Sequence, residues 1–222
     1  MAPGSVESFF LEGEAGRLEA LLNTGVDDPE YSCMVCHPHP LYGGTMHNKV
    51  VFHAMKELNG FGFPVLRFNF RGVGASAGEH DEGQGEVADV QTALDYLLRR
   101  FGRPILFAGF SFGAAVGLRA AVPHPQVSAL IGLGVPVNAE GRLYSYKLLE
   151  ESTKPKLLLS GTHDQFASPN QLRTIYAAAA EPKKLALIPE ADHFFTGKLA
   201  EMRTELGEWV SEIVGHGAFP AV

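Results

Sequence analysis

The segment ILFAGFSFGAAVGLRAA, residues 105–121, constrains the fold more than any other part of the chain. An apolar run typical of a buried strand passes directly into GFSFG (residues 109–113), and an alanine-rich stretch typical of a helix follows. So abrupt a turn needs glycine two positions before and after the serine, because side chains there would collide. The pattern predicts a strand–turn–helix unit that projects Ser111 Oγ above a sheet at a helix N-terminus, where developing negative charge is stabilised.

Short apolar and β-branched runs alternate with longer stretches of helical period along the rest of the chain. This alternation is typical of a mostly parallel sheet flanked by helices, and the first two strands can pair as an antiparallel hairpin. We expect a three-layer α/β fold with about eight strands and about six helices. The expected strands cover Ser5–Phe10, Leu18–Leu22, Ser32–Cys36, Val65–Phe70, Ile105–Ala108, Ala129–Leu133, Leu157–Ser160 and Leu185–Ile188. The expected helices cover Asn48–Leu58, Glu86–Arg100, Phe112–Ala121, Leu143–Glu150, Pro169–Ala180 and Leu199–Val214.

The composition is that of one globular domain, which we place over residues 1–222. Hydrophobic residues make up 45% of the chain and charged residues 19%, and the formal net charge is -7. This charge, without any Lys/Arg run, argues against a nucleic-acid partner. No apolar run reaches the roughly 18 residues of a membrane span, and the N-terminus lacks signal-peptide character. We expect a cytoplasmic protein, monomer or homodimer, that contacts no membrane and acts on a small molecule.

Ser111 needs a base and an acid before it can act as a nucleophile. A serine hydroxyl reacts at neutral pH only with a base in hydrogen-bond reach, held in the right tautomer by a third group. In proteins with this elbow, the acid and then the histidine follow later strands. The seventh expected strand leads to Asp164 and the eighth to His193. Asp192 is a rival acid, but neighbouring side chains diverge, so we expect Ser111, His193 and Asp164 to form the catalytic set.

Acyl transfer also requires two N–H donors for the oxyanion. The first expected donor is the amide of Phe112, directly after the nucleophile. The second should come from the loop HPHPLYGG (residues 37–44) after the third strand, and the two prolines of this loop have no N–H. Leu41 is the expected donor, because the glycines beyond it permit close approach of substrate, and His39 remains open.

Three other motifs carry less weight. The segment CMVCH (residues 33–37) matches haem-attachment and redox patterns, but it lies on an expected buried strand. The segment GVGASA (residues 72–77) loosely matches a dinucleotide fingerprint, but an acidic loop follows it. The most clustered candidate metal ligands are His37, His39, His163 and Asp164. Because they lack the paired spacing of a metal site on one helix face, we expect no metal and no cofactor.

A combination of motifs covers nearly the whole chain: HPHPLYGGTMHNKVV, RFNFRGVGAS, GFSFGA, the loop Gly161–Asp164, and ADHFF. With these motifs the sequence resembles small, lid-less α/β-hydrolases similar to dienelactone hydrolases. The resemblance implies an α/β-hydrolase fold without a cap domain, and ester hydrolysis in general. Dienelactone hydrolases carry a cysteine nucleophile where this chain has Ser111, so their particular substrate does not transfer.

The sequence therefore predicts a serine hydrolase of the carboxylesterase type that cleaves small acyl esters through an acyl-enzyme. Thioester hydrolysis, peptide hydrolysis and acyl transfer would use the same residues, and a non-catalytic binding protein could retain the fold. Between the sixth and seventh expected strands there is room for one helix of about two turns. We therefore expect an open site without a cap, which prefers short acyl chains.

Overall fold

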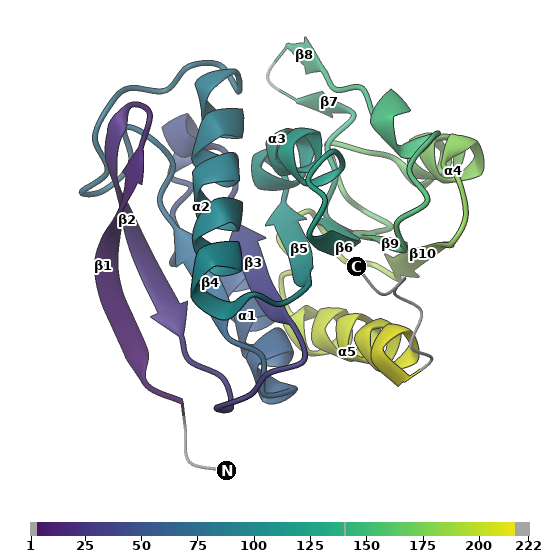
Figure 1. Ribbon diagram of the computed structural model, residues 1–222. Coiled ribbons are helices and arrows are strands. Elements are labelled where there is room, and N and C mark those ends of the chain that lie inside the picture. Colours follow the sequence, from purple (N-terminus) through teal and green to yellow (C-terminus); the bar gives the residue numbers. More distant parts are fainter. Residues whose placement is uncertain (1–3, 140, 216–222) are drawn as a thin grey trace.

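The computed structural model describes residues 4–139 and 141–215. Its main sheet consists of eight strands: β1 (Val6–Gly13), β2 (Gly16–Asn23), β3 (Ser32–Cys36), β4 (Val65–Phe68), β5 (Ile105–Phe110), β6 (Val127–Leu133), β9 (Lys156–Gly161) and β10 (Lys183–Ile188). The strand order is β1-β2-β4-β3-β5-β6-β9-β10 (Figure 1). β2 is antiparallel to β1 and to β4, and all other neighbouring strands are parallel. The predicted mostly parallel sheet is confirmed.

The order of the strands changes direction at β3. This strand pairs with β4 on one side and with β5 on the other, parallel to both. In an open α/β sheet the connections from two such strands leave toward opposite faces, which creates a crevice at their carboxyl ends. The loop after β3 and the turn after β5 both begin at this crevice, so the fold brings residues 37–44 close to Ser111.

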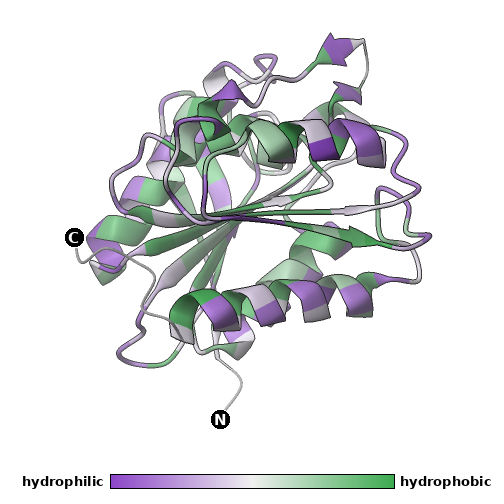
Figure 2. Ribbon diagram, turned by 90° about the vertical axis from the view of Figure 1, so that its right-hand side faces the viewer, coloured by the Kyte–Doolittle hydropathy of each residue, from purple (hydrophilic) through white to green (hydrophobic). Residues whose placement is uncertain are grey.

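Helices cover both faces of the sheet. Within the described residues there are five: α1 (Lys49–Gly60), α2 (Gly85–Phe101), α3 (Phe112–Ala121), α4 (Pro169–Ala178) and α5 (Leu199–Gly215). α1 and α5 pack on one apolar core, and α2, α3 and α4 pack on the other. Along β5, Phe107 faces one core and Phe110 the other, as the pleat of a strand requires. Figure 2 shows the sheet edge-on between the two helical layers, so the predicted three-layer architecture is confirmed.

Local side-chain contacts fix where two of these helices begin. At α1, Asn48 Oδ1 accepts the N–H of Val50 at 2.9 Å. At α4, Ser168 and Gln171 form a reciprocal capping box, and Pro169 occupies the first helical position. Each contact satisfies an N–H that has no acceptor within the helix, so the sequence sets these boundaries locally.

The expected helix over Leu143–Glu150 is wrong. The connection instead contains a two-stranded hairpin and one 3₁₀ turn: β7 (Asn138–Ala139), β8 (Arg142–Leu143) and η2 (Lys147–Leu149). Tyr146 accounts for the difference, because its ring is buried and its hydroxyl donates to Pro136 O at 2.7 Å. Leu143, which the helix would have buried, is 82% exposed. The described chain therefore has five α-helices, one fewer than expected, and it has no lid.

Two further observations concern the lengths of the helices and the state of the two cysteines. In the part of the chain that the structure describes, no helix is long and apolar enough to cross a membrane. Cys33 and Cys36 are free thiols buried in β3, and burial raises the pKa of both. A buried neutral thiol is a poor nucleophile and a poor metal ligand. These cysteines act as core residues.

Candidate active site

Ser111 lies in the turn between β5 and α3. Its backbone has φ 55° and ψ -121°, a conformation that side chains other than glycine rarely adopt. A Cβ on Gly109 would lie 2.5 Å from Gly113 O, and a Cβ on Gly113 would overlap His37 O. The glycines of the GFSFG segment are therefore required by space, as predicted. The Ser111 side chain makes no capping bond to α3, which leaves its hydroxyl available at the top of the sheet.

The structure brings Ser111, His193 and Asp164 together. Ser111 Oγ lies 2.9 Å from His193 Nε2, and His193 Nδ1 lies 2.9 Å from Asp164 Oδ2. Both ionisable side chains are almost fully buried. Since a carboxylate oxygen only accepts, His193 carries its proton on Nδ1, and Nε2 accepts from the serine hydroxyl.

Further contacts hold Asp164 and the His193 ring in place. Asp164 Oδ2 also accepts from Ser160 Oγ at 2.9 Å, and Oδ1 accepts the Phe166 N–H at 2.8 Å. The ring of Phe166 packs edge-on against His193 at 4.5 Å between centroids. Our sequence reasoning missed Ser160, because a polar residue at the end of an apolar strand gives no signal of its partner four positions later. These contacts restrict the carboxylate to one orientation.

The rival acid, Asp192, has a different set of partners. Its Oδ1 accepts the N–H groups of Phe194 at 3.0 Å and Thr196 at 2.8 Å. These bonds close the turn that follows His193. The Asp192 carboxylate therefore organises the backbone that follows His193, whereas the carboxylate bonded to the His193 ring is that of Asp164.

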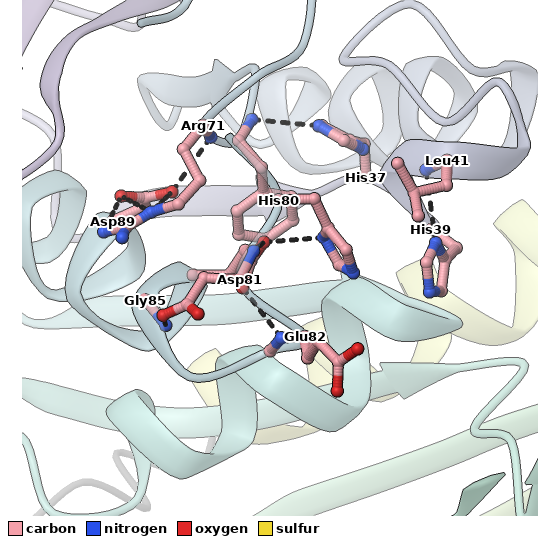
Figure 3. Close-up of polar contacts among 12 residues, drawn as sticks. His37, His39, Leu41, Arg71, His80, Asp81, Glu82, Gly85 and Asp89 are labelled. Atoms are coloured by element: carbon pink, nitrogen blue, oxygen red, sulfur yellow. Dashed lines mark hydrogen bonds and ion pairs between the residues drawn. The ribbon is translucent and has the colours of Figure 1, made fainter. Parts of the chain in front are cut away.

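His37 anchors the loop that follows β3. The Phe70 N–H donates to His37 Nε2 at 3.0 Å, and Figure 3 shows this contact at the His37 ring. The ring proton is therefore on Nδ1, which donates to Pro38 O at 2.7 Å. Burial lowers the pKa of His37 to about 4. A neutral imidazole thus ties the loop to the end of β4, which keeps its amides in a fixed position beside Ser111.

The structure does not bring Leu41 to the site. The Leu41 N–H donates to His39 Nδ1 at 3.2 Å, as Figure 3 shows, and the Leu41 side chain is 68% exposed. His39 instead lies on the cavity wall with Pro38. His39 O accepts the N–H groups of Tyr42 and Gly44, which closes the loop. Pro38 and Pro40 have no N–H, and the His39 ring accepts the N–H of Leu41. The loop therefore differs from the expected geometry.

A second histidine–carboxylate pair lies behind the cavity wall, and our sequence reasoning missed it. His80 Nδ1 lies 2.7 Å from Glu86 Oε1, and both side chains are buried (Figure 3). Glu86 also accepts the N–H groups of Asp81 and Gly83 at 2.9 and 2.8 Å. The His80 ring lies 4.9 Å from the ring of His39. The acidic loop before α2 is therefore an ordered support for the residues after β3.

The cavity above Ser111 is small, about 90 Å³. Its walls combine the catalytic candidates with apolar rings and loop backbone: Pro38, His39, Tyr42, Gly43, Gly44, Asn48, Ser111, Phe112, Pro136, Ala139, Tyr144, Phe166, His193 and Phe194. Tyr42 and Phe194 are also exposed to solvent at its rim. Among the residues that the structure describes, no cluster of three or more His, Cys, Asp or Glu side chains could hold a metal ion. The cavity has room for a reacting carbonyl and a short apolar group.

The sheet topology, the turn at Ser111 and the contacts of His193 define an α/β hydrolase without a lid. The chain matches the family described as alpha/beta hydrolase domain over residues 39–218, and it belongs to this family.

Relatives of known sequence or structure extend this likeness over nearly the whole chain. An uncharacterized protein of Rickettsia prowazekii (strain Madrid E) is 33% identical over 211 residues, which cover 92% of this chain and 88% of that protein. An alpha-beta serine hydrolase homologue from Coxiella burnetii is 35% identical, with a TM-score of 0.83 and coverage of 91% and 96%. A serine hydrolase without lid from Xanthomonas campestris is 30% identical, with a TM-score of 0.81 and coverage of 100% and 99%.

Proposed function

We propose that this protein is a serine hydrolase of the carboxylesterase type, which cleaves small acyl esters through an acyl-enzyme. The observation that carries the proposal is the pair of 2.9 Å contacts from Ser111 through His193 to Asp164, at a serine whose backbone is strained. A strained backbone and a buried histidine–carboxylate pair cost stability, and such costs are concentrated at active sites. This feature favours an enzyme over a binding protein that merely retained the fold.

In the first half of the reaction, Ser111 Oγ attacks the ester carbonyl while His193 Nε2 takes the hydroxyl proton. Asp164 stays ionised and stabilises the imidazolium. The tetrahedral intermediate then breaks its bond to the alcohol, which leaves with the proton from His193. In the second half, water loses a proton to His193 and attacks the acyl-enzyme, and the acid leaves as Ser111 regains its proton. No cofactor takes part in these steps.

The oxyanion requires two donors, and we assign them to Phe112 and His39. Phe112 opens α3, so its N–H has no acceptor within the helix and benefits from the helix dipole. His39 lines the cavity and Leu41 does not. The amide of His39 is therefore better supported than that of Leu41 as the second donor.

The size of the cavity supports a small-molecule ester as substrate. About 90 Å³ holds a short acyl group, and the rings of Phe166, Phe194 and Tyr144 give it an apolar wall. Each methylene that such a wall covers contributes about 0.8 kcal/mol to binding.

Hydrolysis of p-nitrophenyl acetate and butyrate by wild-type protein and Ser111→Ala tests the proposal. We expect the variant to keep less than about a hundredth of wild-type turnover. Its free energy of unfolding should stay within about 1–2 kcal/mol of wild type or increase, since strained catalytic positions cost stability. Ser211→Ala, an exposed position on α5, is the matched control and should behave as wild type. Equal turnover by Ser111→Ala would reject the proposed nucleophile.

A further inference from the structure

A wide groove adjoins the catalytic cavity. Its volume is about 680 Å³, far larger than the 90 Å³ cavity, and the two share Phe112 and Tyr144 as walls. Ala115 and Val116 of α3 line it on one side, and the β8 segment with η2 lines it on the other. Sites for small molecules usually measure about 300–1,000 Å³. The groove is therefore large enough to take the rest of a substrate whose carbonyl is at Ser111.

The groove is rich in positive charge, although the chain as a whole carries a net charge of -7. Among the described residues that line it, three are cationic and one is acidic: Arg119, Arg142, Lys147 and Glu82. No charge elsewhere in its described lining offsets this excess. A hollow with an excess of one sign of charge concentrates ligands of the opposite sign.

Both arginines already have partners on the loop before α2. Arg119 donates to Gly83 O at 2.8 Å and to Gln84 Oε1 at 3.0 Å. Arg142 donates to Glu82 O at 3.3 Å and lies 3.3 Å from the carboxylate of the same residue. Side chains that are already ordered lose less entropy when a ligand binds, and a guanidinium matches carboxylate or phosphate oxygens in pairs.

The charge of Arg142 also reaches the catalytic cavity. Burial lowers the pKa of His39 to about 4, with His80 and Arg142 as further causes and Glu86 opposing them. His39 lines the cavity beside Ser111, whereas Arg142 lines the groove. The two spaces are therefore close enough to act on one ligand.

A second groove adjoins the cavity and shares Gly43, Asn48 and Phe194 with it, with a volume of about 570 Å³. Its only side chain with a permanent positive charge among the described lining residues is Lys49. This groove offers polar and apolar surface without a comparable excess of charge. It suits the neutral part of a substrate.

We propose that the groove beside α3, through Arg142 and Lys147, binds a carboxylate or phosphate group carried by the substrate at the end remote from the scissile bond. This inference rests on the proposed ester hydrolysis and names its substrate class: a small ester or thioester with an anionic end. The neutral cavity takes the reacting carbonyl, and the cationic groove takes the charge.

Matched substrate pairs test the inference. Phenyl butyrate is compared with 4-carboxyphenyl butyrate and 4-phosphophenyl butyrate, which place the anion on the alcohol side. The p-nitrophenyl esters of hexanoate and adipate place it on the acyl side. In one of these sets we expect the anionic member to have a kcat/KM about three- to tenfold higher than the neutral one at low salt, an advantage that shrinks at high salt. The better of the carboxylate and the phosphate identifies the group.

Variants locate the effect. In the double variant Arg142→Gln/Lys147→Gln, the ratio of anionic to neutral kcat/KM should fall to about one. Arg173→Gln removes a charge from the exposed face of α4 and should keep the wild-type ratio. An equal ratio in wild-type protein and the double variant would overturn the inference.

A binding measurement separates this inference from the proposed reaction. Calorimetry with 4-carboxyphenyl butyrate and Ser111→Ala needs no turnover. Binding that weakens about three- to tenfold when Arg142→Gln/Lys147→Gln is added supports the groove even if no ester is hydrolysed. Binding that is equally strong in both proteins, or absent from both for every anionic ester, overturns it whether or not neutral esters are hydrolysed.

Discussion

Two histidines of this chain lie against a buried carboxylate, and they differ in what lies beyond the ring. His193 Nδ1 is 2.9 Å from Asp164, and His80 Nδ1 is 2.7 Å from Glu86. The far nitrogen of His193 meets the hydroxyl of Ser111 at 2.9 Å. The ring of His80 instead packs against other rings, those of His39 and Phe112.

The carboxylates differ in the same way. Asp164 accepts from Ser160, Phe166 and the base, so its contacts orient one imidazole. Glu86 accepts two backbone N–H groups of the loop before α2, so its contacts order a segment of chain. The comparison teaches that a buried histidine–carboxylate pair is not a catalytic signature by itself. The group at the second ring nitrogen decides whether the pair transfers a proton or supports a loop.

Substitution of the two carboxylates gives the largest expected contrast. Asp164→Asn should lower kcat on p-nitrophenyl butyrate by about 10²–10⁴, because the amide favours the wrong tautomer of His193. Glu86→Gln should mainly lower the free energy of unfolding, by about 1–3 kcal/mol, since it disturbs a buried hydrogen-bonded group.

Asp192→Asn is the control for the acid. It retains an oxygen acceptor for the turn after His193, and its effect on kcat should be much smaller than that of Asp164→Asn. A larger loss for Asp192→Asn would transfer the acid role to that residue. A larger loss of kcat for Glu86→Gln than for Asp164→Asn would reverse the comparison of the two pairs.

His37 extends the comparison to a buried histidine whose two ring nitrogens are hydrogen-bonded to backbone groups. Its pKa is lowered from 6.5 to about 4, so between these values the unfolded chain binds a proton that the folded chain does not. The free energy of unfolding should therefore fall as pH falls through this window, by about 3 kcal/mol in full from this group.

Urea unfolding across this pH window measures the slope. His37→Gln removes the titrating group, and its stability should depend less on pH between 6.5 and 4 than that of wild type. His39, whose pKa is also lowered to about 4, contributes a fall of the same sign in both proteins. An identical slope in the two proteins would show that His37 is not held neutral by the fold.

The smallest expected effect concerns acyl-chain length. It tests how much room remains in the cavity that His193 and His39 line. The cavity of about 90 Å³ holds a short chain, and a longer one must enter solvent or the cationic groove. We expect kcat/KM for p-nitrophenyl acetate and butyrate to exceed that for octanoate by up to about tenfold, since added methylenes gain no burial. A steady rise in kcat/KM from butyrate to decanoate would reveal a channel.

Much of the fold and of the candidate catalytic set followed from short-range patterns. Gly109 is required by an overlap with Gly113 O, four residues away, and the strands that lead to Asp164 and His193 are recognisable as apolar runs. The elements that failed depend on contacts that no local pattern records. The segment after β8 looks helical, but the hydroxyl of Tyr146 bonds to Pro136 and the ring is buried.

The loop residues show the same limit. Leu41 was a reasonable donor by spacing, but the ring of His39 takes its N–H, and this depends on a side-chain rotamer. His80 lies in the acidic loop that follows residue 77, and Glu86 lies at the start of the expected helix Glu86–Arg100. Charge alone does not reveal that a carboxylate is buried under several N–H groups.

The nucleophile can be tested directly with a fluorophosphonate, which reacts with an activated serine hydroxyl. Intact mass and peptide mapping should show one adduct, on Ser111, in wild-type protein and none in Ser111→Ala. His193→Ala should label at least about 10²-fold more slowly than wild type, whereas His80→Ala should keep the rate within about tenfold. An adduct on another residue, or labelling of His193→Ala at the wild-type rate, would contradict the account.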